Sequence, residues 1–277
     1  MRRRDALLGA AALAAAYRAA ADARQASTAL PSVQVLPDAV EIPGLRRRRT
    51  LRLCLPPSYA REPTRRYPLV VLHDAQNLFD AITSFAGEWG VDEAMDTLAA
   101  ATGFEALVVG IDHGGERRVA EMLPRPHGEF RQADGDAYAD FVVHTLLPWV
   151  AARYRVREGA EHAAIGGSSM GAVISQHLLQ RHPGRFGKAL LFSPAYWVAP
   201  SLFEQAAAQP LPAGSRVAWY AGGSEGSTMV PLVERMQALV RAQGTATRLH
   251  VEPQGRHNEA AWRAALPQAL RWLFDLG

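Results

Sequence analysis

Residues 163–181 read AAIGGSSMGAVISQHLLQR, and this stretch decides how the chain is organised. A short apolar run, Ala163–Ile165, leads into Gly167–Gly171, a G-x-S-x-G pentapeptide centred on Ser169, and a helical pattern, Met170–Arg181, follows. A serine on a tight turn between strand and helix adopts strained geometry, and glycines two residues to either side avoid a collision there. We therefore predict that Ser169 is a nucleophile. The alternative is a Ser/Gly turn that only caps a helix.

Short apolar runs and helical patterns alternate along the rest of the chain. Two half-buried strands, Val33–Ile42 and Arg49–Leu55, are predicted first, with Pro43-Gly44 as the turn between them. The later strand candidates are continuous apolar runs, which suit strands buried on both faces of a parallel sheet. They are Leu69–Leu72, Ala106–Ile111, Ala163–Ile165, Ala189–Phe192, Val217–Tyr220 and Thr247–Val251. Helical periodicity is found in Val91–Ala101, Ala137–Tyr154, Met170–Arg181, Val230–Gln243 and Ala260–Leu276.

This alternation predicts an α/β fold in a single domain, residues 31–277. The central sheet is expected to be mostly parallel, with a leading antiparallel pair and helices on both faces. A length of 277 residues with 48% hydrophobic residues is enough for a large core, and the single cysteine, Cys54, excludes an intrachain disulfide and a thiolate zinc ribbon.

The charge of the chain is nearly balanced. Lysine and arginine exceed aspartate and glutamate by three, and by one when residues 1–23 are left out. A nearly neutral protein lacks the excess of positive charge that binds nucleic acid, so no nucleic-acid partner is expected. We interpret the arginine run at 46–49 as a charged guard near the edge of the sheet, in preference to a binding patch.

The first thirty residues have the pattern of an export signal. Three arginines at 2–4 precede an apolar run, Ala6–Ala16, and small residues with an A-x-A-like step at Ala21–Ala23 follow. Paired arginines before an alanine-rich run are typical of a twin-arginine signal, and the run is too short to span a bilayer. Residues 1–30 are therefore predicted to be a signal peptide, with a periplasmic or secreted location. The alternative is an alanine-rich N-terminal helix that does not direct export.

A serine hydroxyl needs a base within hydrogen-bond reach, and nine histidines compete for this role. His257 lies after the last strand candidate and before the final helix. In an α/β-hydrolase arrangement nucleophile, acid and histidine follow in this order, and the histidine occupies such a loop. His257 is the predicted base. We interpret His177 and His182 as surface residues, and His144 and His162 as structural.

The acid is expected after the strand that precedes this histidine. Val217–Tyr220 runs into a glycine loop that carries Glu225, at the strand end where open α/β sheets build their sites. Glu225 would fix the tautomer of the imidazole and stabilise its protonated form. Glu234, inside a helix, and Glu252, within the last strand candidate, are worse placed. The alternative for Glu225 is a solvated loop carboxylate.

An oxyanion hole needs two backbone donors. The amide of Met170 opens the helix after the nucleophile, and the loop after Leu69–Leu72 would supply a second amide, from Ala75 or Gln76. His73-Asp74 in that loop could suggest a metal pair, but no third ligand follows at a useful spacing, so we expect no metal and no cofactor.

Several stretches resemble the putative-esterase family of α/β-hydrolases, which includes enterochelin and other siderophore esterases and feruloyl esterases. They are Leu72–Asp80 (LHDAQNLFD), Gly87–Glu93, Val109–Ile111, Arg117-Arg118 with Glu121 and Pro124, Gly167–Gly171 and His257–Trp262. The resemblance covers roughly residues 33–275. It implies an α/β-hydrolase fold, with the nucleophile at Ser169, the histidine at His257 and the acid at Glu225. Two positions depart from the family pattern, because Ala75 and Ala172 stand where glycines are usual.

The substrate site is expected to be open. About twenty residues, Ala195–Ser215, separate the sixth and seventh strand candidates, too few for a large cap domain. We expect a rim of Tyr196, Trp197 and Phe203 together with the Gly114–Asp134 loop. The aromatic residues could stack on planar acyl groups or only pack. The residues predicted to contact substrate are Asp74, Arg117, Arg118 and Trp197, and the arginine pair is suited to an anionic group.

The sequence as a whole predicts a serine carboxylic-ester hydrolase acting on a soluble small-molecule ester, such as a siderophore lactone or an aromatic acyl ester. The alternatives are an acyltransferase that uses the same serine, and a non-catalytic ligand-binding protein on a hydrolase scaffold. No stable membrane insertion is expected after export, and no oligomeric state is predicted.

Overall fold

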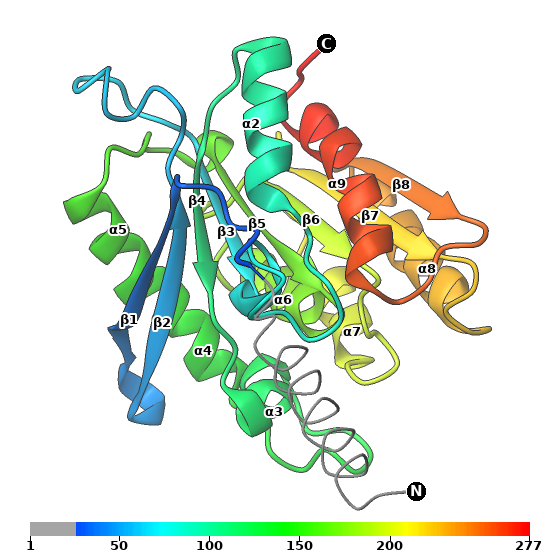
Figure 1. The fold of residues 1–277 in the computed structure, drawn as a ribbon. Helices are drawn as coiled ribbons and strands as arrows, with labels where there is room; N and C mark the ends of the chain where they lie inside the picture. The colour runs from blue at the N-terminus through cyan, green and yellow to red at the C-terminus, as the bar shows by residue number, and fades with distance from the viewer. Residues whose placement is uncertain (1–25) are drawn as a thin grey trace, which may run out of the picture.

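The computed structural model describes residues 26–277. One sheet of eight strands forms its centre, in the order β1-β2-β4-β3-β5-β6-β7-β8 (Figure 1). The strands are β1 (Val33–Ile42), β2 (Arg47–Cys54), β3 (Leu69–His73), β4 (Leu107–Ile111), β5 (Ala163–Ser168), β6 (Lys188–Phe192), β7 (Arg216–Gly222) and β8 (Ala246–Glu252). β2 pairs antiparallel with β1 and β4, and every other pairing is parallel. The predicted α/β class and leading antiparallel pair are confirmed.

Helices cover both faces of the sheet (Figure 1). They are α2 (Val91–Thr102), α3 (Arg118–Met122), α4 (Gly135–Phe141), α5 (Leu147–Arg153), α6 (Met170–Arg181), α7 (Ser201–Ala208), α8 (Met229–Ala242) and α9 (Glu259–Leu273). The short helices α3 and α7 were not predicted, because each has too few turns to show a clear period. Residues 1–25, with most of the expected signal, lie outside the described residues.

The core consists of two apolar layers, one on each face of the sheet. Along β3, Leu69 and Val71 face the layer that includes α6, whereas Val70 and Leu72 face the layer that includes α2 and α9. Successive side chains of a strand point to opposite faces, so a strand buried on both sides must be apolar throughout. This explains why the central strands were recognisable as short continuous apolar runs.

The single helix expected at Ala137–Tyr154 is interrupted. A π-helical turn, η4 (Val142–Leu146), separates α4 from α5. Pro148 lies in the first turn of α5, and a proline ring clashes with the carbonyl four residues earlier, here His144. A wider turn relieves that clash, so the structure replaces one long helix by three consecutive segments.

The arginine run does not guard the sheet edge. It lies in and just before β2, which is the second strand, because β1 occupies the edge. Arg49 is buried against Glu121 of α3, and Arg47 contacts the same carboxylate. These arginines hold the 114–134 segment against the sheet, so the interpretation as an edge guard was wrong.

Candidate active site

Ser169 stands between β5 and α6 in strained backbone geometry. Its φ of 55° and ψ of −118° lie in a region that side-chain-bearing residues rarely adopt. Its amide donates to the carbonyl of Phe192 at the end of β6. A Cβ added at Gly167 would lie 3.0 Å from the backbone of Gly171, so the two flanking glycines allow the strand and the helix to meet closely.

Glu225 and His257 meet at the carboxyl end of β7. His257 Nδ1 lies 2.6 Å from Glu225 Oε2. The Glu225 side chain is 1% exposed, whereas that of His257 is 36% exposed. A buried carboxylate on Nδ1 leaves Nε2 as the nitrogen that can accept a proton, which is the arrangement a general base requires.

Two residues that the sequence did not single out hold this carboxylate. Ser193 donates to Glu225 Oε1 at 2.7 Å, and the amide of Gly222 donates to the same oxygen at 2.7 Å. Trp262 in turn donates its indole N–H to Ser193. Ser193 follows β6 directly, so its place at the carboxyl end of a strand beside β7 was the available signal.

The loops that carry Glu225 and His257 are joined through their backbones. The amide of Ser224 donates to the carbonyl of Gly255, and that of Gly223 donates to Glu252. A Cβ added at Gly255 would lie 2.2 Å from the hydroxyl of Tyr220. The close approach therefore depends on glycine, and it fixes the distance between carboxylate and imidazole.

Ser169 and His257 line one cavity of about 310 Å³. Its other lining residues are Asp74, Asn77, Phe85, Ala86, His113, Arg118, Ser168, Glu259 and Trp262. No hydrogen bond joins Ser169 to His257 within residues 26–277. Contacts between a nucleophile and its base are often loose in enzymes without substrate and tighten in the complex.

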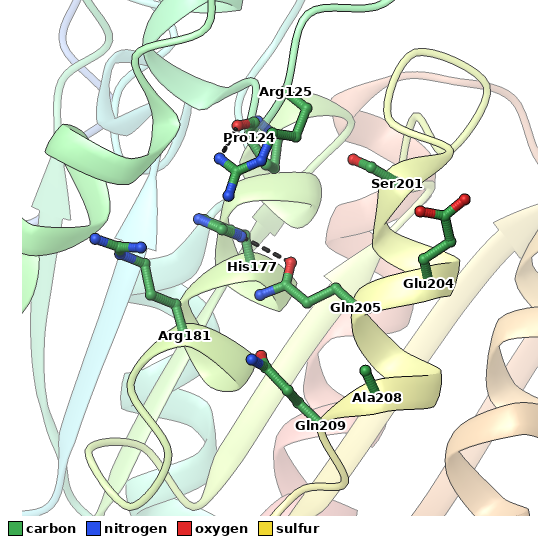
Figure 2. Close-up of a pocket in the computed structure, with 9 residues that line it drawn as sticks. All are labelled: Pro124, Arg125, His177, Arg181, Ser201, Glu204, Gln205, Ala208 and Gln209. Atoms are coloured by element: carbon green, nitrogen blue, oxygen red, sulfur yellow. Dashed lines mark hydrogen bonds between the residues drawn. The ribbon is translucent and has the colours of Figure 1, made fainter.

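A second cavity, about 600 Å³, lies between α6, α7 and the Pro124-Arg125 segment (Figure 2). Neither Ser169 nor His257 lines it, so the smaller cavity is the candidate active site. His177 points into this region and contacts Gln205 at 2.8 Å (Figure 2). Its side chain is 3% exposed and also contacts Asp136 at 2.8 Å, so its interpretation as a surface residue was wrong.

The loop after β3 lies beside Gly171, two residues after Ser169. A Cβ added at Gly171 would lie 3.0 Å from Asp74 Oδ2, so this loop packs directly on the start of α6. Ala75 and Gln76 open a 3-10 turn, and the first amides of a helical turn have no acceptor within it. The same holds for Met170 at the start of α6.

The alanine at position 75 is compatible with a donor role. The residue with positive φ in this loop is Asp74 (59°), not Ala75, so the alanine methyl meets no backbone strain. The methyl group has room because residue 110 in β4 is glycine. A Cβ added at Gly110 would lie 2.7 Å from the Ala75 methyl. Asp74 is held in its left-handed conformation by Arg118, which donates to both carboxylate oxygens at 2.6 and 2.8 Å.

The residues expected to contact substrate divide into two groups. Asp74 and Arg118 line the cavity, but they are paired with each other. Arg117 and Trp197 do not line it. Tyr196 and Phe203, expected at the rim, are buried in the core. The sequence missed Phe85, a 95% exposed aromatic residue at the cavity.

His73 lies fully buried beneath the loop, with Nδ1 3.1 Å from the hydroxyl of Tyr138. Burial lowers the pKa of His73 from 6.5 to about 4, because desolvation disfavours the charged imidazole. In the unfolded chain this imidazole binds a proton near pH 6.5, whereas in the folded chain it does so only near pH 4. The free energy of unfolding therefore decreases as the pH falls through this window.

We expect this histidine to reduce the free energy of unfolding by about 2 kcal/mol between pH 7 and about pH 4.5. Urea unfolding at the two pH values measures the loss, and His73→Gln, which does not titrate, should lose that much less. An equal loss in both proteins would contradict the buried neutral state of His73.

Comparisons with known proteins show the family of the chain. A family described as "Putative esterase" matches residues 42–273, most of the chain. The chain belongs to this esterase family. A comparison with curated protein sequences finds no match.

Solved structures with the same fold include esterases and a siderophore hydrolase. The siderophore hydrolase EstA from Aspergillus nidulans is 15% identical, with a TM-score of 0.73, 88% of this chain covered and 94% of that chain. A ferulic acid esterase is 20% identical, with a TM-score of 0.64 and 88% and 97% covered. The enterobactin esterase FES from Shigella flexneri is 20% identical, with a TM-score of 0.67 and 90% and 61% covered. The esterase thus has the predicted α/β-hydrolase fold, and between β6 and β7 the structure contains the single helix α7 and no large cap.

Membership of the family makes the protein an ester hydrolase, as predicted. Within residues 26–277 of the esterase, no helix is both long and apolar enough to cross a membrane.

Proposed function

We propose that the protein is a serine carboxylic-ester hydrolase in which Ser169, His257 and Glu225 form the catalytic triad. The observation that carries this proposal is the 2.6 Å contact between His257 Nδ1 and the buried Glu225, at the cavity that Ser169 also lines. Three side chains from separate loops converge at one end of the sheet, although they are 56 and 32 residues apart in sequence.

In this mechanism Ser169 Oγ attacks the ester carbonyl while His257 Nε2 takes the hydroxyl proton. His257 then returns the proton to the leaving alcohol, and water releases the acyl group from Ser169 by the same steps. Glu225 holds the imidazole in the required tautomer. The amides of Met170 and of Ala75 or Gln76 stabilise the oxyanion, aided by the positive end of the α6 dipole.

The cavity favours a soluble ester with a planar or aromatic acyl part. Phe85 and Trp262 supply aromatic surface, whereas Asn77, His113 and Arg118 make part of the lining polar. Catecholate lactones and feruloyl esters combine these features. The structural relatives whose names refer to siderophores and ferulic acid support the same substrate classes.

Labelling with a fluorophosphonate tests this proposal, because such probes react with activated serines. We expect one adduct, located on Ser169 by mass spectrometry, that is lost in His257→Ala. Turnover of a catecholate lactone and of a feruloyl ester by the unmodified protein then identifies the acyl class. A folded protein that takes up no probe, yet binds these esters, would be a binding protein on a hydrolase scaffold.

We also propose that the protein is exported. Arginines 2–4 and the apolar run after them support this, and Ser27, Thr28 and Leu30 hydrogen-bond to Asp80, Glu88 and Asp92, respectively. These contacts favour cleavage near Ala21–Ala23, ahead of Ser27, rather than after residue 30. The N-terminal sequence of the protein recovered from a bacterial periplasm checks this.

A further inference from the structure

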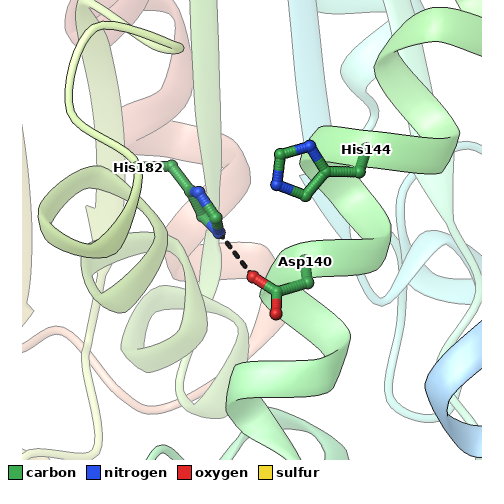
Figure 3. Close-up of side chains that lie close together, drawn as sticks. All are labelled: Asp140, His144 and His182. Carbon is green, nitrogen blue, oxygen red and sulfur yellow. Dashed lines mark ion pairs between the residues drawn. The ribbon is translucent and has the colours of Figure 1, made fainter.

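Two histidines and a carboxylate lie together on the surface formed by α4, η4 and the end of α6 (Figure 3). Asp140 and His144 are four residues apart on the α4–η4 segment, and His182 caps the carboxyl end of α6. One ligand atom from each lies within 4.8 Å of the other two. None of the three lines the cavity of Ser169 and His257.

His144 lies beside Asp140 because residues four positions apart share one face of a helical segment. The two imidazole rings of His144 and His182 are 5.3 Å apart and nearly perpendicular. His144 is exposed, so the cluster opens to solvent. Ions can therefore reach it without any opening of the core.

His182 Nε2 is a buried nitrogen without a hydrogen-bond partner among residues 26–277. It lies 2.9 Å from Asp140 Oδ1, and Figure 3 marks this contact as an ion pair.

We propose that Asp140, His144 and His182 bind a divalent transition-metal ion, Zn²⁺ foremost, which joins α4–η4 to the end of α6. Two imidazoles and one carboxylate are ligands that Zn²⁺ prefers, and water would complete the coordination. Donor atoms around one Zn²⁺ lie roughly 3–4 Å apart, so small side-chain rotations are sufficient.

Arg181 competes for the same carboxylate. Its guanidinium donates to both oxygens of Asp140, at 3.1 and 3.0 Å, and lies 3.4 Å from Asp136. A metal ion on Asp140 would face this positive charge. Removal of the arginine should therefore strengthen metal binding, whereas a cluster that only forms ion pairs predicts no such gain.

Calorimetric titration of the untagged protein with ZnCl₂, and visible spectra with Co²⁺ as a probe, test the site. We expect one equivalent to bind, with at least a tenfold loss of affinity in His144→Ala and in His182→Ala, a gain in Arg181→Gln, and a rise in Tm with Zn²⁺. His162→Ala, which changes a histidine outside the cluster, and His257→Ala should bind as tightly as the unmodified protein.

Equal affinity in the unmodified protein and in a folded His144→Ala variant would overturn the proposal, as would the absence of binding. The outcome is independent of the esterase proposal, because His257→Ala removes the catalytic base and leaves the three metal ligands in place.

Discussion

Replacement of His257 by alanine should lower kcat for ester hydrolysis by about 10⁵-fold or more, and Ser169→Ala should have a similar effect. Without the imidazole, the Ser169 hydroxyl has no group to take its proton. The residual rate would come from the oxyanion hole and substrate binding alone. Release of p-nitrophenol from a short-chain ester measures kcat and KM.

The double variant separates a catalytic unit from two independent residues. Because serine and histidine act in the same step, Ser169→Ala/His257→Ala should be no slower than either single variant. His162→Ala is the control, since this histidine lies outside the cavity. If His257→Ala kept more than about a hundredth of the activity, another group would be the base.

Glu225→Gln should lower kcat by about 10⁴-fold with little change in KM. Glutamine has the same shape and can still accept from Ser193 and Gly222 through its carbonyl. Its amide N–H₂ would then face His257 Nδ1, so that Nδ1 must accept and Nε2 carries the proton. That tautomer cannot serve as a base.

Glu234→Gln, on the exposed side of α8, is the matched control and should leave kcat unchanged. The Glu225→Gln protein should unfold at a similar urea concentration to the unmodified protein, whereas Glu225→Ala should be less stable, because Ser193 and Gly222 lose their acceptor. Unchanged kcat in a folded Glu225→Gln would show that the carboxylate only supports the loop.

The parts of the fold that could be predicted are those with a local physical cause. The core strands are continuous apolar runs because they are buried on both faces, and β3 shows this most clearly. The turn at Ser169 requires glycine on both sides for steric reasons that belong to the pentapeptide itself. Positions with such local causes are visible in one sequence.

The errors came where the cause lies elsewhere in the chain. The arginines of β2 were interpreted without the partner that explains them, Glu121, which is about seventy residues away. His177 was assigned to the surface, but α7 and Asp136 cover it. Tyr196 and Phe203 were predicted to form an aromatic rim, but both side chains are buried in the core.

By itself, the sequence determined the α/β class, the alternation of strands and helices, and the residue types that an esterase requires. Each follows from the periodic pattern of apolar residues or from local backbone geometry. Only the tertiary structure brought Glu225 within reach of His257, linked Ser193 and Trp262 to that carboxylate, and set His182 against Asp140. Those contacts join residues up to 69 positions apart, and their distances are fixed by how strand ends and loops pack in space.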